Sequence, residues 1–146
     1  MVFVFLTEID ISFIMIETNC KMTKRVIKTM ETPNVNILAY PTCWPLPNRE
    51  PVEIDIMAVF QTAFRTNTML EINTMPNRPD FRDTHTYQAK ELIVKLAINT
   101  DAHSTEHFGF MRFGEGRTRR GWCQAKDIIN TMPLDERTAY LKLPKE

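Results

Sequence analysis

Three short runs of apolar and β-branched residues recur along the chain, separated by stretches with helical spacing. The runs are VNILAY at Val35 to Tyr40, TMLEIN at Thr68 to Asn73 and KLAINT at Lys95 to Thr100. Short buried strands that alternate with helices are typical of βαβ units, in which the strands lie parallel in one sheet. The sequence therefore predicts an α/β fold with three parallel strands at its centre.

The apolar spacing between these runs predicts crossover helices over 53–66 and 84–93. The rest of the chain follows the same kind of pattern less regularly. The further predicted elements are strands over 3–11 and 13–16, helices over 23–30, 105–113, 126–131 and 134–143, an irregular proline-rich loop over 41–51 and an arginine-bearing loop over 114–121.

Length and charge restrict the class of protein. The chain has 146 residues, the size of one domain, so we expect a single domain over 1–146. Its 18 basic and 18 acidic side chains cancel, so no overall field attracts the molecule to nucleic acid or to an anionic membrane. Three cysteines without a C-x-x-C pair indicate a reducing, cytoplasmic environment. No run reaches the ~18 apolar residues of a membrane helix, and Glu8 and Asp10 interrupt the apolar start, so neither a membrane span nor a signal peptide is expected.

Polar residues stand at the predicted carboxyl ends of the three strands, where parallel α/β folds build their binding sites. They are Tyr40, Asn73 and the run Thr100-Asp101-Ala102-His103. Asp101 and His103 are two residues apart, so in an extended segment both side chains point to the same side. A carboxylate and an imidazole together suit a zinc, manganese or iron ion. The pattern alone leaves open the alternative of a capping aspartate followed by a loop histidine.

The sequence around this run carries further motifs. They are LEIN at Leu70 to Asn73, TDAHS at Thr100 to Ser104 and RRGW at Arg119 to Trp122, preceded by NILAYPTCWPLPNREPVEIDIMAVF at Asn36 to Phe60. In this combination the chain resembles the end of the PHP (polymerase and histidinol phosphatase) domain of bacterial family-X DNA polymerases. The resemblance is nearly continuous from Met22 to the C-terminus.

The resemblance implies a distorted parallel βα barrel that binds divalent metal ions at its strand ends and hydrolyses phosphoesters, typically at the 3′ end of DNA. The metal would be manganese, zinc or magnesium, and such ions turn bound water into a nucleophile. On this pattern Asp101 and His103 match metal ligands, and Glu8 in FLTEIDI resembles the family's metal-bridging glutamate. DNA 3′ ends are the partner that the resemblance implies.

Several histidines that the resemblance calls for are absent. Family members begin with an H-x-H strand, continue with an S-x-H strand and place another histidine in an H-P-T-G loop, whereas the first histidine here is His85. We therefore expect the chain to start after the H-x-H strand and to form a partial or open barrel. In place of the H-P-T-G loop it has Tyr40-Pro41-Thr42-Cys43, and a phenol is a poor substitute for imidazole as a metal ligand. A complete multinuclear metal site is not expected from this chain alone.

A basic segment follows the D-x-H run. Within it, Arg117, Arg119 and Arg120 suit bidentate contacts with phosphate, although a solvated or structurally paired arginine loop is the commoner outcome. Asn73 is the candidate site-facing group of the second strand, with a turn-capping role as an equal alternative. His107 is a weaker candidate for a metal ligand.

Three hypotheses remain open. The chain is a PHP-type phosphoesterase or 3′-5′ exonuclease whose missing strands come from a second chain, a non-catalytic remnant with weak DNA or metal affinity, or an unrelated α/β binding module. Asp101, His103 and Glu8 cannot supply three protein ligands to each of two ions, so the histidine count favours the remnant. No nucleotidyltransferase signature is visible in the sequence, so no polymerase domain is expected in it.

Overall fold

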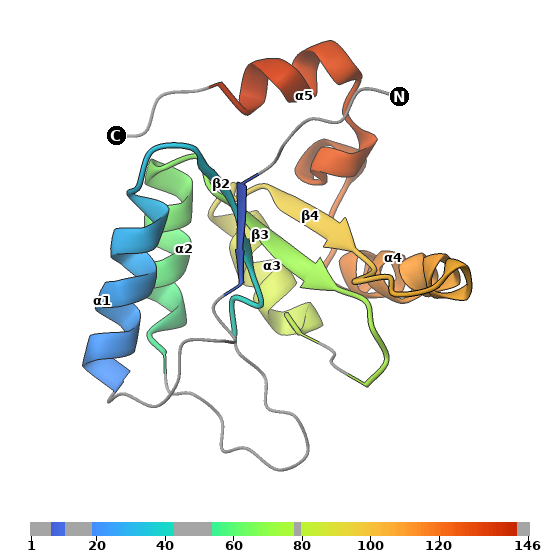
Figure 1. Ribbon diagram of the computed structural model, residues 1–146, viewed down its shortest axis with the longest axis horizontal. Helices are drawn as coiled ribbons and strands as arrows, with labels where there is room; N and C mark the ends of the chain where they lie inside the picture. The colour runs from blue at the N-terminus through green and yellow to red at the C-terminus, as the bar shows by residue number, and fades with distance from the viewer. Residues whose placement is uncertain (1–6, 11–18, 43–53, 78–79, 143–146) are drawn as a thin grey trace.

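The computed structural model describes residues 7–10, 19–42, 54–77 and 80–142 (Figure 1). Four strands alternate with three helices, and two more α-helices and three 3-10 segments follow the last strand. The elements are β1 (Thr7–Asp10), α1 (Asn19–Met30), β2 (Val35–Ala39), α2 (Ile56–Arg65), β3 (Met69–Asn73), α3 (Asp83–Glu91), β4 (Leu96–Asn99), η2 (Thr105–Phe110), α4 (Met111–Arg120), η3 (Ala125–Asp127), η4 (Ile129–Thr131) and α5 (Leu134–Tyr140).

The four strands form one parallel sheet in the order β1-β2-β3-β4. Asn73 at the end of β3 lies opposite Asn99 at the end of β4, so the carboxyl ends of these strands are level. The predicted parallel arrangement of three strands is confirmed, and β1 falls within the strand predicted over 3–11. The strand predicted over 13–16 lies outside the described residues. The α/β class is confirmed, and the four described strands do not close into a barrel.

Helices α1, α2 and α3 cover one face of the sheet (Figure 1). Side chains alternate between faces along a strand, and the set on this side is apolar. It consists of Leu38, Leu70, Ile72 and Leu96. These residues pack against Met22, Val26 and Met30 of α1, Val59, Phe60 and Ala63 of α2, and Phe81, Ala89 and Val94 in and beside α3. The main core therefore lies on one side of the sheet and leaves the strand ends free for polar groups.

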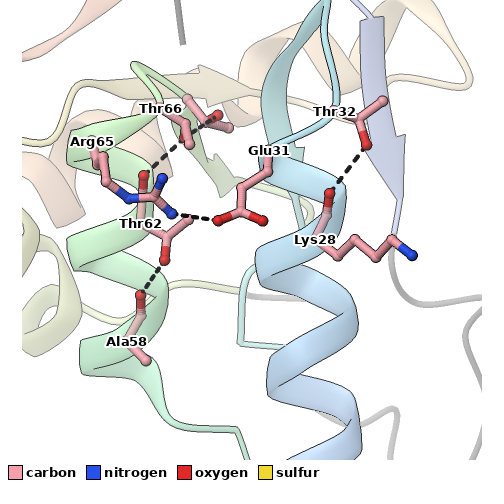
Figure 2. A network of polar contacts seen from close by, with 8 residues as sticks. Lys28, Glu31, Thr32, Ala58, Thr62, Arg65 and Thr66 are labelled. Atoms are coloured by element: carbon pink, nitrogen blue, oxygen red, sulfur yellow. Dashed lines mark hydrogen bonds and ion pairs between the residues drawn. The ribbon is translucent and has the colours of Figure 1, made fainter. Parts of the chain in front are cut away.

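Polar contacts join the ends of α1 and α2 that lead into the sheet (Figure 2). Nη2 of Arg65 lies 2.5 Å from Oε1 of Glu31, and the two side chains are 44% and 43% exposed. An ion pair this exposed contributes only ~0.2–1 kcal/mol, so it adds little to the packing of the two helices. Within α2, Thr62 and Thr66 donate their hydroxyl hydrogens to carbonyl oxygens four residues earlier, at 2.9 and 2.8 Å. Both threonines can therefore be buried without an unsatisfied hydroxyl.

The C-terminal segment packs on the opposite face of the sheet. A second, smaller core there consists of Ile37, Met69, Ala97 and Ile129, with Met132, Tyr140 and Leu141 packed against it. Burial raises the pKa of the Tyr140 phenol to about 12. Tyr140 of helix α5 and the following Leu141 thus cover part of this second face of the sheet.

The helices predicted over 23–30, 53–66, 84–93 and 134–143 are confirmed with small shifts of their ends. The segment predicted as one helix over 105–113 is the 3-10 segment η2 followed by the start of α4, and the one predicted over 126–131 is two 3-10 segments, η3 and η4. Helix α2 begins after Asp55, whose side chain accepts a hydrogen bond from the Ala58 N–H at 3.0 Å, and helix α5 begins directly after Pro133, as expected. Helix α1 starts earlier than predicted, at Asn19, and has 12 residues. None of the helices in the described part of the chain has the length and apolar character to cross a bilayer.

The prediction of a loop over 114–121 is wrong, because residues 114–120 belong to α4, which ends at the cap residue Gly121. Two glycines suggested a turn, but one of them serves packing. A Cβ added to Gly114 would lie 2.4 Å from Cγ2 of Ile98 and 2.5 Å from Cγ2 of Thr74. Gly114 is therefore the residue that lets α4 approach the ends of β3 and β4, despite the cost of glycine within a helix.

Candidate functional site

Tyr40 and Asp101 meet at the carboxyl ends of β2 and β4. The Tyr40 hydroxyl donates to Oδ2 of Asp101 at 2.6 Å. Both residues have a φ of 50°, in the left-handed region that residues other than glycine seldom adopt. Left-handed residues other than glycine are often found at functional sites, held there by surrounding contacts. The two strand-end residues therefore lie together, as expected where the carboxyl ends of parallel strands meet at one edge of a sheet.

His103 lies next to Asp101 but faces solvent. Its Nδ1 is 2.7 Å from the Asp101 carbonyl oxygen and 4.0 Å from Oδ1 of the Asp101 carboxylate, and its side chain is 70% exposed. Its backbone N–H donates to Nδ1 of His107 at 3.1 Å. Asp101, His103 and His107 therefore form one local cluster on the loop after β4 and on η2.

Glu71 is a buried carboxylate at the same end of the sheet. It is 1% exposed, and its Oε2 accepts a hydrogen bond from the Tyr40 N–H at 3.2 Å. It also lines a cavity of about 160 Å³ between the sheet and the C-terminal segment, with Ile37, Ala97, Ile98, Asn99, Ile129, Asn130, Arg137 and Leu141. Sequence reasoning preferred Asn73 in the LEIN run and missed Glu71. The available signal was an acidic residue inside an apolar strand, which requires a buried partner.

Asn73 has the turn-capping role that was the alternative to a site-facing one. Its side-chain oxygen accepts a hydrogen bond from the Met75 N–H at 2.9 Å. Its backbone carbonyl accepts another from Nη1 of Arg117 at 2.5 Å, and its Nδ2 is buried without a hydrogen-bond partner. Asn73 thus shapes the turn after β3.

Two of the three candidate phosphate-binding arginines are engaged within the protein. Nη1 of Arg117 also donates to the Asp80 carbonyl at 3.1 Å, and burial lowers the pKa of this guanidinium. Nε of Arg120 donates to Oδ2 of Asp83 at 3.0 Å, which lowers the pKa of that carboxyl. Arg119 is exposed. The arrangement favours the structurally paired alternative for Arg117 and Arg120.

A further buried carboxylate, Asp80, holds the loop that follows Tyr40. It is 2% exposed, and it accepts hydrogen bonds from the Thr42 hydroxyl and, at 3.2 Å, from the Thr42 N–H. Sequence reasoning gave Asp80 no role, because nothing in its neighbours indicates a partner 38 positions away. Together with Arg117, it ties the Tyr40 loop to α4.

The described residues do not fit a cluster of metal ions. Among them, no group of three or more histidine, cysteine, aspartate or glutamate side chains is arranged to hold an ion. Glu8 lies in β1 with its backbone opposite Ile37, and its side chain is outside the described residues. Asp101 and His103 offer two donors side by side, and Tyr40 occupies one oxygen of the first. This donor set suits at most one weakly held ion.

Comparison with known proteins identifies a relative among the curated proteins. No family model matches the chain. The chain is 38% identical over 142 residues to the DNA polymerase/3′-5′ exonuclease PolX of Bacillus subtilis (strain 168), an alignment that covers 94% of this chain. It spans only 25% of the length of that protein. The resemblance to the family-X DNA polymerases is confirmed by this comparison.

Proposed function

Because nearly the whole chain is similar to a quarter of a DNA polymerase/3′-5′ exonuclease, we propose that it is a single PHP-like domain without metal-dependent hydrolytic activity of its own. The observation that carries this proposal is the hydrogen bond from the Tyr40 phenol to Asp101. In the family that this chain resembles, a histidine stands at the position of Tyr40, and the aspartate that matches Asp101 binds metal. Here the aspartate is paired with a phenol.

The chemistry of the donor atoms supports the absence of catalysis. A two-metal phosphoesterase holds its ions ~3.5–4 Å apart, with several fixed ligands on each, so that both the attacking and the leaving oxygen are stabilised. A neutral phenol, with an ordinary pKa of ~10, must lose its proton to bind a metal ion well, whereas a neutral imidazole already offers a lone pair. The domain therefore binds at most one manganese, zinc or magnesium ion, through Asp101 and His103, with water completing the coordination.

The proposal is tested by restoring the missing imidazole. Tyr40→His removes the hydroxyl that occupies Oδ2 of Asp101. It also adds an imidazole nitrogen as a third candidate metal ligand beside Asp101 and His103. Calorimetric titration with Zn²⁺ and Mn²⁺ should give a dissociation constant at least ~10-fold lower for Tyr40→His than for the natural chain. Changes of this size in metal affinity are typical when a group that holds a metal ligand in place is removed. Tyr87→His is the matched control, because Tyr87 is 45% exposed on α3.

Activity is measured on the same proteins. Release of a 3′-terminal nucleotide from DNA in Mn²⁺ should stay at background for the natural chain and should not change in Asp101→Asn. Robust Mn²⁺-dependent release that disappears in Asp101→Asn or His103→Ala would overturn the proposal. That result would mean that Glu8 or a second chain completes the site.

A further inference from the structure

The cavity beside Glu71 interrupts the smaller core on the second face of the sheet. Its volume of about 160 Å³ is below the ~300–1,000 Å³ of pockets that hold drug-sized molecules. Its apolar walls are Ile37, Ala97 and Ile129, which belong to the smaller core, and Leu141, which packs against that core. A cavity of this size and lining suits a small ligand with a compact apolar part.

Two side chains of opposite charge line this cavity. Glu71 comes from β3 and is buried, and Arg137 comes from α5 and is partly buried. The two are not paired with each other, and within the described part of the chain the Arg137 guanidinium has no hydrogen-bond or ion-pair partner. The space between them therefore has a carboxylate at one wall and a guanidinium at another.

The wall formed by the sheet is held in place by hydrogen bonds. Oε2 of Glu71 accepts from the Tyr40 N–H at 3.2 Å, which fixes the carboxylate against the end of β2. The Asn130 side chain accepts from the Ile98 N–H at 2.8 Å and donates to the Ile98 carbonyl at 2.9 Å, which fixes the segment after β4 against that strand. Because these groups are already ordered, a ligand that enters the cavity loses little affinity to ordering them.

We propose that this cavity binds a free α-amino acid with a small apolar side chain, with the ammonium group on Glu71 and the carboxylate on Arg137. Hydrogen bonds between ionised groups are stronger than neutral ones, and a guanidinium matches a carboxylate in bidentate fashion. A zwitterion makes both contacts at once, whereas a molecule with one charge makes only one. The site is separate from Asp101 and His103 and needs no metal ion, so it goes beyond the proposed function.

Calorimetric titration with three probes of similar shape tests the proposal. The probes are L-valine, isobutylamine, which lacks the carboxylate, and 3-methylbutanoate, which lacks the ammonium group. L-valine should bind, and each analogue should bind at least ~10-fold more weakly, as expected for loss of one charge-assisted hydrogen bond. Absence of L-valine binding, or an analogue that binds as tightly as L-valine, would overturn the proposal. Working in EDTA makes the result independent of the metal titrations of Tyr40→His, so the two proposals fail separately.

Variants of the two charged residues assign each contact. Arg137→Gln should weaken L-valine binding by about 10- to 150-fold and remove its advantage over isobutylamine. Glu71→Gln, which keeps an oxygen for the Tyr40 N–H, should remove the advantage of L-valine over 3-methylbutanoate. The matched control is Arg112→Gln, because Arg112 is exposed on α4 and does not line the cavity, and it should bind L-valine like the natural chain.

Melting temperatures without ligand show whether each variant is folded. Helix α5 has no buried residue, so Arg137→Gln should melt like the natural chain and keeps the test valid if Glu71→Gln does not fold. Equal affinity of Arg137→Gln and the natural chain for L-valine would overturn the proposal.

Discussion

The hydroxyl of Tyr40 and the carboxylate of Asp101 are joined across the end of a strand that belongs to neither of them. Tyr40 follows β2 and Asp101 follows β4, and β3 lies between these strands in the sheet. A hydrogen bond of 2.6 Å therefore spans the end of β3 and links residues 61 positions apart. It joins the two loops directly, in addition to the hydrogen bonds that Glu71 and Asp80 accept from the Tyr40 loop.

Removing this hydroxyl should reduce stability. Tyr40→Phe leaves Oδ2 of Asp101 without its donor while preserving the ring, so the free energy of unfolding should fall by about 0.5–1.5 kcal/mol. Urea denaturation measures the change. Tyr87→Phe serves as control, since Tyr87 is exposed on α3, and it should unfold like the natural chain. Equal stability of the two variants would show that the bond contributes nothing in solution.

Replacing Glu71 should separate the role of its oxygen from that of its charge. Glu71→Gln keeps an oxygen that can accept from the Tyr40 N–H, whereas Glu71→Ala leaves that N–H without a partner and enlarges the cavity. We expect the alanine variant to lose about 1–3 kcal/mol more than the glutamine variant. Chemical denaturation of both provides the comparison. Equal losses in the two variants would mean that the carboxylate charge, which both remove, is what the fold requires.

The two glycines of α4 should respond oppositely to alanine. In Gly114→Ala the new methyl meets the branched side chains of Ile98 and Thr74, which have little freedom to move aside, so a loss of about 1–3 kcal/mol is expected. In Gly116→Ala the nearest atom is Nη1 of Arg120 at 3.6 Å, and the gain in helix propensity should stabilise by roughly 0.5–1 kcal/mol. Thermal unfolding of both variants tests this, and a stable Gly114→Ala would contradict the described packing of α4.

Acid should destabilise the fold through His85. Burial lowers the pKa of this imidazole, and Arg82 lowers it further, while Nδ1 is buried without a hydrogen-bond partner. The unfolded chain then binds more protons than the folded chain once the pH falls below about 6.5, so stability is full above that pH and declines below it. Melting temperatures measured from about pH 7.5 to about pH 5 should fall less in His85→Gln than in the natural chain. Parallel curves would remove His85 as the cause.

The strands could be predicted from the sequence because their signals are local. Runs such as those at 35–40 and 95–100 are apolar, β-branched and bounded by polar residues, and the alternation with helices implies parallel pairing. The helix at Gly114 could not be predicted, because the reason for that glycine is the approach of a distant strand.

The contact partners of the site residues could not be predicted from the sequence either. Asp101 and His103 were identifiable as neighbours from their spacing, but the contact of Asp101 with Tyr40 and that of Glu71 with the Tyr40 N–H depend on how the strands are ordered. For Arg117 the sequence left both phosphate contact and structural pairing open, because it could not identify a partner. Its carbonyl partners, at Asn73 and Asp80, are on other elements.

The pairing of Tyr40 with Asp101 has a consequence for how such a domain changes over generations. Tyrosine and histidine codons differ by one base, so a single point mutation separates this site from one with an imidazole at the same place. Because the phenol already has a partner in Asp101, the tyrosine state is supported by the fold and does not depend on a bound ion. Exchange of tyrosine and histidine at position 40 is therefore a one-step change for the gene.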